Sequence, residues 1–292
     1  MRLAGALLLA LAACTDKDKD DAPPVDSDTG PDVLDLELRF AAEIDNQPVS
    51  CHREVHYQGL LGNATVRVRG MRVFVSNVGM VDASGNTTLL ELDQDDWQID
   101  RTALLDYEDG AEYCEGGTAE MNTTVRGKVP NADYTGLAFT IGVPEDLNHS
   151  PIDAGTPAAL NHPELFTGAL YGYHYLKLDM TTTGEPEGYP IHVHASGCIV
   201  DEFGNPAGCS GANLVTFVLP AFDPDTQQVT LDLSDLLSRN DIDRNAASPG
   251  GQETAAGCQS DTTDPDCQTF FTSYGLSALP PTWVRAAEVL RP

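Results

Sequence analysis

Long apolar runs are absent from this sequence of 292 residues. Beyond residue 14, no segment approaches the roughly 18 apolar residues that a membrane-spanning helix needs. Basic residues are scarce too, because 16 Lys and Arg stand against 45 Asp and Glu, for a net charge of −29. Nucleic acids and anionic lipid surfaces require a basic face, so we expect neither as a partner. The charge suits a cation or a basic protein, although a solubilising surface is the more common reason for it.

Familiar catalytic motifs are also missing. The sequence contains no GxSxG, HExxH, P-loop or GxGxxG pattern, and scattered Ser, His and Asp residues do not indicate a hydrolase. It has no CxxC either, which argues against a thiolate zinc site or a thioredoxin-like redox pair. We therefore expect a binding protein and not an enzyme.

The first residues resemble an export signal. Residues 1–14 contain one Arg, an apolar run and small residues that end at Cys14, a layout typical of secretory signals. The last four, LAAC, resemble a bacterial lipobox, in which the cysteine is lipidated; an ordinary signal peptide is the alternative. Residues 15–33 hold seven Asp and three Pro, which predicts a disordered acidic tether. We therefore expect a periplasmic or cell-surface protein with a lipid anchor in the inner or outer membrane.

Six cysteines remain after Cys14, an even number that indicates disulfides in an oxidising compartment. Sequence alone permits fifteen pairings of six cysteines. Short spacing favours Cys198–Cys209 and Cys258–Cys267, which leaves Cys51–Cys114.

Short strands separated by turn residues dominate residues 34–292, which we expect to form one domain. This pattern predicts an all-β fold, an antiparallel β-sandwich with long loops stapled by disulfides. The clearest strand patterns are Val33–Phe40, Thr65–Val75, Leu137–Val143, Tyr173–Leu178, Leu214–Leu219 and Gln228–Leu233. Short helical turns are expected at Ser234–Ser238 and Pro163–Phe166, and residues 240–268 are interpreted as a long polar loop.

Two histidines have the spacing of a metal site. His192 and His194 alternate along a predicted strand, so their imidazoles project from one face and are able to meet one ion. Imidazole suits copper, zinc, iron or nickel. Histidines with ordinary hydrogen-bond partners are the alternative. His174 is predicted on another strand, and His149 on a loop, where ligands are commonly carried.

Several short sequence motifs occur in an order typical of one protein family. RVFVSNV at Arg72–Val78 is followed by WQ at Trp97, by ALLDYE at residues 103–108, and by YTGL, GVP and LNH between Tyr134 and His149. Cys198, Cys209, Asn213 and the DPDC of residues 264–267 continue the order. Over roughly residues 35–275, this set resembles the MbnP-like family of copper-binding proteins.

The resemblance implies a periplasmic or surface β-sandwich that binds copper. It also implies a MauG-like di-haem cytochrome c peroxidase partner, which converts a tryptophan to a kynurenine that completes the copper site with histidines. His149 matches the histidine of the family's LNH phrase, and His192 matches the one six residues before Cys198. Trp97 matches the tryptophan of WQ and is our candidate for oxidative modification.

Departures from the family pattern fall close to these residues. Thr167 and Ala169 stand where many members have tryptophans. His174 replaces a usual lysine, and His194 replaces a glycine. Two imidazoles thus appear where two indoles are lost, which leads to the hypothesis of an all-histidine site made of His149, His174, His192 and His194.

Taken together, the sequence predicts an exported copper-binding protein for capture or delivery, with Cu(I) or Cu(II) as cofactor. The alternative is an adhesion or interaction lipoprotein that uses the same sandwich without metal. A zinc hydrolase is more remote, because no general base has an assigned place beside the histidines.

Overall fold

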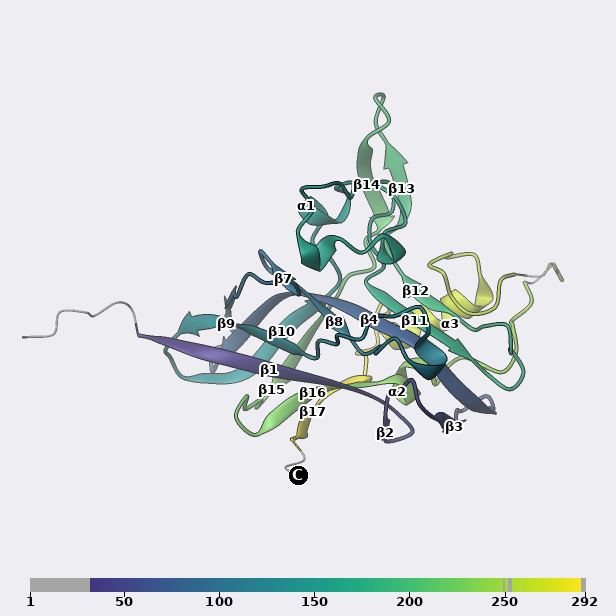
Figure 1. Ribbon diagram of the computed structural model, residues 1–292, viewed down its shortest axis with the longest axis horizontal. Coiled ribbons are helices and arrows are strands. Elements are labelled where there is room, and N and C mark those ends of the chain that lie inside the picture. The colour runs from purple at the N-terminus through teal and green to yellow at the C-terminus, as the bar shows by residue number, and fades with distance from the viewer. Residues whose placement is uncertain (1–31, 249, 252–253, 290–292) are drawn as a thin grey trace, which may run out of the picture. The chain divides into compact units, whose positions relative to one another are not determined.

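The computed structural model describes residues 32–248, 250–251 and 254–289 (Figure 1). The predicted signal peptide with Cys14, and the tether as far as residue 31, lie outside the described residues. Residues 33–292 group into one unit. Its strands are β1 (Val33–Ile44), β2 (Gln47–Pro48), β3 (Glu54–Gln58), β4 (Asn63–Asp82), β5 (Thr87–Leu89), β6 (Glu91–Leu92), β7 (Gln98–Ile99), β8 (Thr102–Asp106), β9 (Thr124–Pro130), β10 (Tyr134–Ile141), β11 (Leu176–Thr181), β12 (Ile191–Val193), β13 (Ser196–Val200), β14 (Pro206–Gly211), β15 (Val215–Pro220), β16 (Gln227–Asp232) and β17 (Val284–Glu288).

The strands form two main sheets. The first has the order β17-β16-β1-β9-β6, with β2 paired to β1, and the second has the order β12-β11-β4-β10-β15. In the second sheet β3, β5 and β8 also pair with β4, and β7 pairs with β8. Among the named strands of the described residues, each pair is antiparallel except β1 with β16, which is parallel. This parallel pair departs from the expected antiparallel arrangement.

Aromatic side chains join the inner faces of the two sheets. Along β1, alternate residues turn inward, so Phe40 is buried. Its ring meets Phe139 of β10 edge to face at 5.3 Å, and Phe139 stacks on Phe217 of β15 at 5.6 Å. Offset and edge contacts of this kind add to the free energy gained by burial. The all-β sandwich expected from strand alternation is confirmed.

The central strand β4 is buried on both faces from Gly70 to Ser76. One face packs into the sandwich core. The other carries Arg72 and Phe74, and the ring of Phe74 lies 5.5 Å from that of Tyr173, in the long connection before β11. A strand covered on both sides is able to hold charged groups out of water, and Arg72 is such a buried charged group.

Helices are few: α1 (Glu145–Asn148), α2 (Leu233–Leu237), α3 (Pro265–Tyr274) and the 3-10 turns η1 (Glu112–Cys114), η2 (Ala158–Leu160) and η3 (Pro163–Leu165). The expected turns near Ser234 and Pro163 correspond to α2 and η3. No helix within the described ranges is long and apolar enough to cross a membrane.

The interpretation of residues 240–268 as loop was wrong at its end, where α3 begins. The Asp264 side chain accepts from the backbone N–H of Asp266, Pro265 opens the first turn, and Gly275 ends the helix at φ 118°. These are the usual signals at the two ends of a helix.

Three disulfides staple the fold. They join Cys51 to Cys114, Cys198 to Cys209 and Cys258 to Cys267, the same pairs that the spacing favours. The second staples the β13–β14 hairpin, where Cys198 and Cys209 are direct cross-strand partners. This hairpin extends away from the two sheets (Figure 1).

Candidate metal centre

Three of the four predicted histidines lie together at the β12 edge of the second sheet. His192 lies in β12 and His194 directly follows it, so the two alternate as their spacing predicts. His174 precedes β11, which begins at Leu176, and is therefore not inside a strand as expected. Its ring centroid lies 4.8 Å from that of His192 and 5.4 Å from that of His194.

The environment keeps His174 neutral. Its Nδ1 is buried and has no hydrogen-bond partner among the described residues. Burial lowers the pKa of His174 to about 3, and the neighbouring His192 and His194 add to the effect. Burial also lowers the pKa of His194, although the carbonyls of Ala195 and Gln259 oppose it. A buried imidazole with a free nitrogen is suited to accept a metal ion, since metal ligation needs the neutral form.

His192 is held by a carboxylate. Its Nε2 lies 2.7 Å from Oδ1 of Asp179, and Oδ2 of Asp179 lies 2.5 Å from the Lys177 ammonium. The pKa of Asp179 lies well below its usual range: burial alone would raise it, but His192 and Lys177 together outweigh burial. Asp179 is therefore a carboxylate, and Nε2 of His192 is the protonated nitrogen that donates to it.

A row of polar side chains crosses four strands and ends at His192. Asp106 of β8 pairs with Arg72 of β4, Arg72 with Lys177 of β11, and Lys177 with His192 of β12. Direct cross-strand partners face the same side of a sheet. The row therefore forms one continuous polar stripe that ends at the candidate centre.

Arg72 is the buried centre of this row. Its side chain is 3% exposed, and it bonds Asp106 at 2.8 Å, Glu108 at 2.7 Å and also Glu164. Burial raises the pKa values of Asp106 and Glu108, although Arg72 opposes this effect. The pKa of Glu164 is lowered to about 2, and the hydrogen bond from His162 is the largest cause. Three carboxyl groups thus share the one guanidinium of Arg72.

Gly70 makes room for this charge. It lies opposite Asp179 on the neighbouring strand, and a Cβ at this position would collide with Oε2 of Glu108. Glycine thus allows the Glu108 carboxylate to approach the strand carrying Asp179.

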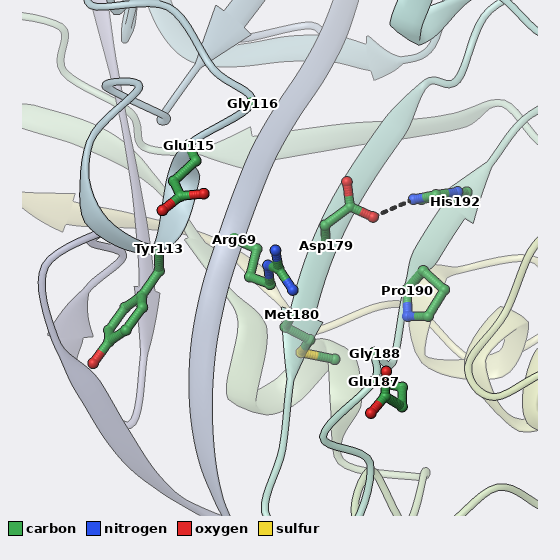
Figure 2. Close-up of a pocket in the computed structure, with 10 residues that line it drawn as sticks. All are labelled: Arg69, Tyr113, Glu115, Gly116, Asp179, Met180, Glu187, Gly188, Pro190 and His192. Atoms are coloured by element: carbon green, nitrogen blue, oxygen red, sulfur yellow. Dashed lines mark hydrogen bonds and ion pairs between the residues drawn. The ribbon is translucent and has the colours of Figure 1, made fainter.

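A cavity of about 400 Å³ borders the His192–Asp179 pair. Figure 2 shows these two residues on one side of it, with Arg69, Tyr113 and Glu115 on the other. His192 and Asp179 thus both line this cavity.

The loop between Phe166 and Tyr173 closes the other side of the cluster. These two residues form an isolated bridge, and Thr167 and Ala169, where the family resemblance leads us to expect tryptophans, lie between them. The ring of Tyr171, 38% exposed, lies 5.6 Å from that of His194. Tyr171 is thus the aromatic side chain beside the cluster. Neither Tyr171 nor Asp179 was predicted as a site residue, although the alternation along β11 places Asp179 on the same face as Lys177.

His149 does not join the cluster. Its Nδ1 lies 2.8 Å from the carbonyl oxygen of Ala169, and its Nε2 lies 3.3 Å from the Asn148 amide and 3.4 Å from Glu145. Within the described part of the chain, it has no hydrogen bond or ring contact with the other three histidines. It supports the loop that carries Tyr171.

The two tryptophans differ in access. Trp97 is half-buried just before β7, at the margin of the core, whereas Trp283 is fully buried against Phe217 and Tyr274. Neither indole contacts an imidazole in the described ranges. Of the two indoles, Trp97 is the one with exposed surface.

The remaining histidines have ordinary partners: His52 pairs with Asp109, His56 with Thr65 and His162 with Glu164. In residues 32–248, 250–251 and 254–289, no group of three or more His, Cys, Asp and Glu is arranged so that it could hold a metal ion. The three clustered imidazoles are in ring contact, and a three-ligand site would require them to turn.

Comparisons with known proteins agree with this fold. The sequence profile of a family described as MbnP matches residues 34–260. The structure is similar to that of MbnP from Methylosinus trichosporium, with a TM-score of 0.74 and 26% identity, over 88% of this chain and 99% of that one. Among curated protein sequences, none matches this chain.

Proposed function

Because this chain belongs to the MbnP family, we propose that it binds copper outside the cytoplasm, for capture or delivery, and does not catalyse a reaction. The observation that carries the proposal is the unpartnered, buried Nδ1 of His174, held against His192 and His194. Leaving a buried polar atom without a partner costs about 1–3 kcal/mol, and a metal bond offsets that cost.

Copper uses imidazole nitrogens readily in both common oxidation states, and imidazoles are the groups gathered in this cluster. In the proposed site, His174 and His192 supply the first two nitrogens, and His194 supplies the third after its ring turns and releases the carbonyl of Ala195. This rotation accounts for the lack of a preformed three-ligand group. His149 is left out, because within the described residues it makes no ring contact with the other three histidines and bonds the carbonyl of Ala169 instead.

The proposal includes export and a lipid anchor at Cys14. It rests on the export-like residues 1–14 and the acidic segment that follows them. The surplus of carboxylates in the chain favours accumulation of cations near its surface.

A MauG-like di-haem partner is part of the proposal as well. Of the two indoles, Trp97 is the substrate we propose for conversion to kynurenine, because Trp283 is enclosed by the core. Since Trp97 lies outside the histidine cluster, the copper site we propose does not depend on this modification.

A second candidate function is metal-free interaction with another protein. One observation favours it: the tip of the β13–β14 hairpin exposes Ile199 by 64% and Phe203 by 80%. Exposed apolar side chains on a projecting element are typical of contact surfaces.

Copper titration of the purified protein separates the two candidates. We expect binding by the wild type, and weaker binding by His174→Ala, His192→Ala and His194→Ala. His56→Ala is the matched control, because His56 lies on β3 and bonds Thr65 outside the cluster. Unchanged affinity in both His192→Ala and His194→Ala would contradict the all-histidine site, and absence of copper binding by the wild type would favour the interaction protein.

A further inference from the structure

Asp179 determines which nitrogen of His192 is free. An ionised carboxylate only accepts hydrogen bonds, so Nε2 of His192, 2.7 Å from it, carries the proton. In a neutral imidazole the other nitrogen, Nδ1, then has the lone pair. The two ring nitrogens point away from each other, so the free Nδ1 points away from Asp179.

Asp179 is itself held in place. Lys177 bonds its second oxygen at 2.5 Å, and Lys177 is the direct cross-strand partner of both His192 and Arg72. The carboxylate is therefore fixed by a neighbour on its own strand, and the imidazole is fixed by the carboxylate.

We propose that Asp179 is a positioning residue, which orients His192 so that Nδ1 is its metal-binding nitrogen. The inference rests on the proposed copper function and extends it to a residue that does not touch the ion. Carboxylates bonded to the second nitrogen of a ligating histidine fix its tautomer and raise its basicity as a ligand. Asp179 stands in this relation to His192.

Two measurements on the full chain test the role of Asp179. The first uses apo protein and needs no metal: long-range proton–nitrogen NMR spectra report the tautomer of His192. We expect the Nε2–H tautomer in the wild type and a mixture in Asp179→Asn, because an amide both accepts and donates. The second is Cu(I) competition titration, in which we expect Asp179→Asn to bind about 10- to 100-fold more weakly than the wild type.

Asp109→Asn is the matched control, because Asp109 bonds Nε2 of His52 at 2.6 Å in a similar pair outside the cluster. We expect it to leave copper affinity unchanged, and urea unfolding confirms that both variants are folded. An Nδ1–H tautomer in the wild type, or unchanged affinity in Asp179→Asn while His192→Ala loses binding, would overturn the positioning role and leave the copper function standing. A folded wild type with His192 in the Nε2–H tautomer that binds no copper would overturn the copper function instead.

Discussion

The imidazole rings of His174 and His192 lie with their centroids 4.8 Å apart and their planes tilted by 54°. One ring comes from the connection that leads into β11 and the other from β12. Because His174 is buried, a proton on its ring would be poorly solvated and would also repel a proton on His192. This contact therefore makes the stability of the protein sensitive to acid.

We expect the free energy of unfolding of the apo protein to fall as pH decreases from about 6.5 towards 3. The folded-state pKa of His174 is lowered to about 3 from the ordinary 6.5, so in this window the unfolded chain binds a proton that the folded chain does not. The contribution of His174 is fully present above pH 6.5 and is lost through this range. Urea unfolding at a series of pH values measures it. His174→Phe removes the titrating group and should flatten part of the dependence; identical pH profiles in the two proteins would contradict the prediction.

Arg72→Met should destabilise the fold by about 3–5 kcal/mol, the usual cost of removing one partner from a buried ion pair. The reason is that Asp106 and Glu108 would lose the cation that bonds them inside the sheet. The matched control is Arg101→Met, since Arg101 pairs with Asp100 and Asp146 near the surface, where such pairs contribute about 0–1 kcal/mol. Denaturant unfolding of both variants measures the two losses in the free energy of unfolding. Equal losses of stability would show that Arg72 has no special role.

Removing the Cys51–Cys114 disulfide by paired alanine substitutions should lower the free energy of unfolding by about 4 kcal/mol, from the entropy of the loop it closes. Its cysteines are 63 positions apart, against 11 for Cys198 and Cys209. The latter pair should contribute about 3 kcal/mol on the same basis. Thermal and urea unfolding of the two double variants compares them. A larger loss in the hairpin variant would mean that loop length does not set the order.

Protein purified from its native host should carry the kynurenine mass change on the Trp97 peptide only. Trp283 is the internal control, because it is fully buried and bonds the carbonyl of Tyr274 through its indole N–H. Peptide mass spectrometry reads both sites at once. An unmodified Trp97 together with bound copper would support a site made of histidines alone. Modification of Trp283 would contradict the prediction that only the exposed indole is oxidised.

Local patterns in the sequence predicted a large part of this architecture. Alternation marked β1 and the pair His192 and His194, because the two-residue period of a strand is a local property. Short spacing likewise predicted the Cys198–Cys209 and Cys258–Cys267 bonds. The helix α3 was missed although its cap residues, Asp264 and Gly275, were in view, because the polar composition before it favoured a loop.

The contacts within the candidate site arise from pairing between strands that are distant in the sequence. That Arg72, Lys177 and His192 form one row follows from the register of β4, β11 and β12, and no local pattern contains it. Burial of Arg72 is equally hidden, since an arginine in a strand is ordinarily exposed. For the same reason Asp179 was not recognised as a site residue.

The parallel pairing of β1 with β16 has a consequence for how the protein is made. The first strand of the domain pairs with β9 on one edge, but its parallel partner on the other edge forms only after residues 227–232 exist, so its sheet is completed late and through contacts between sequence-distant segments. Such contacts slow folding, because a long loop must close before they form. A chain that emerges from a membrane starting at its N-terminus would keep one edge of β1 open for most of its passage. Folding of this domain would then be coupled to the end of export, and an interrupted chain would present that edge to aggregation.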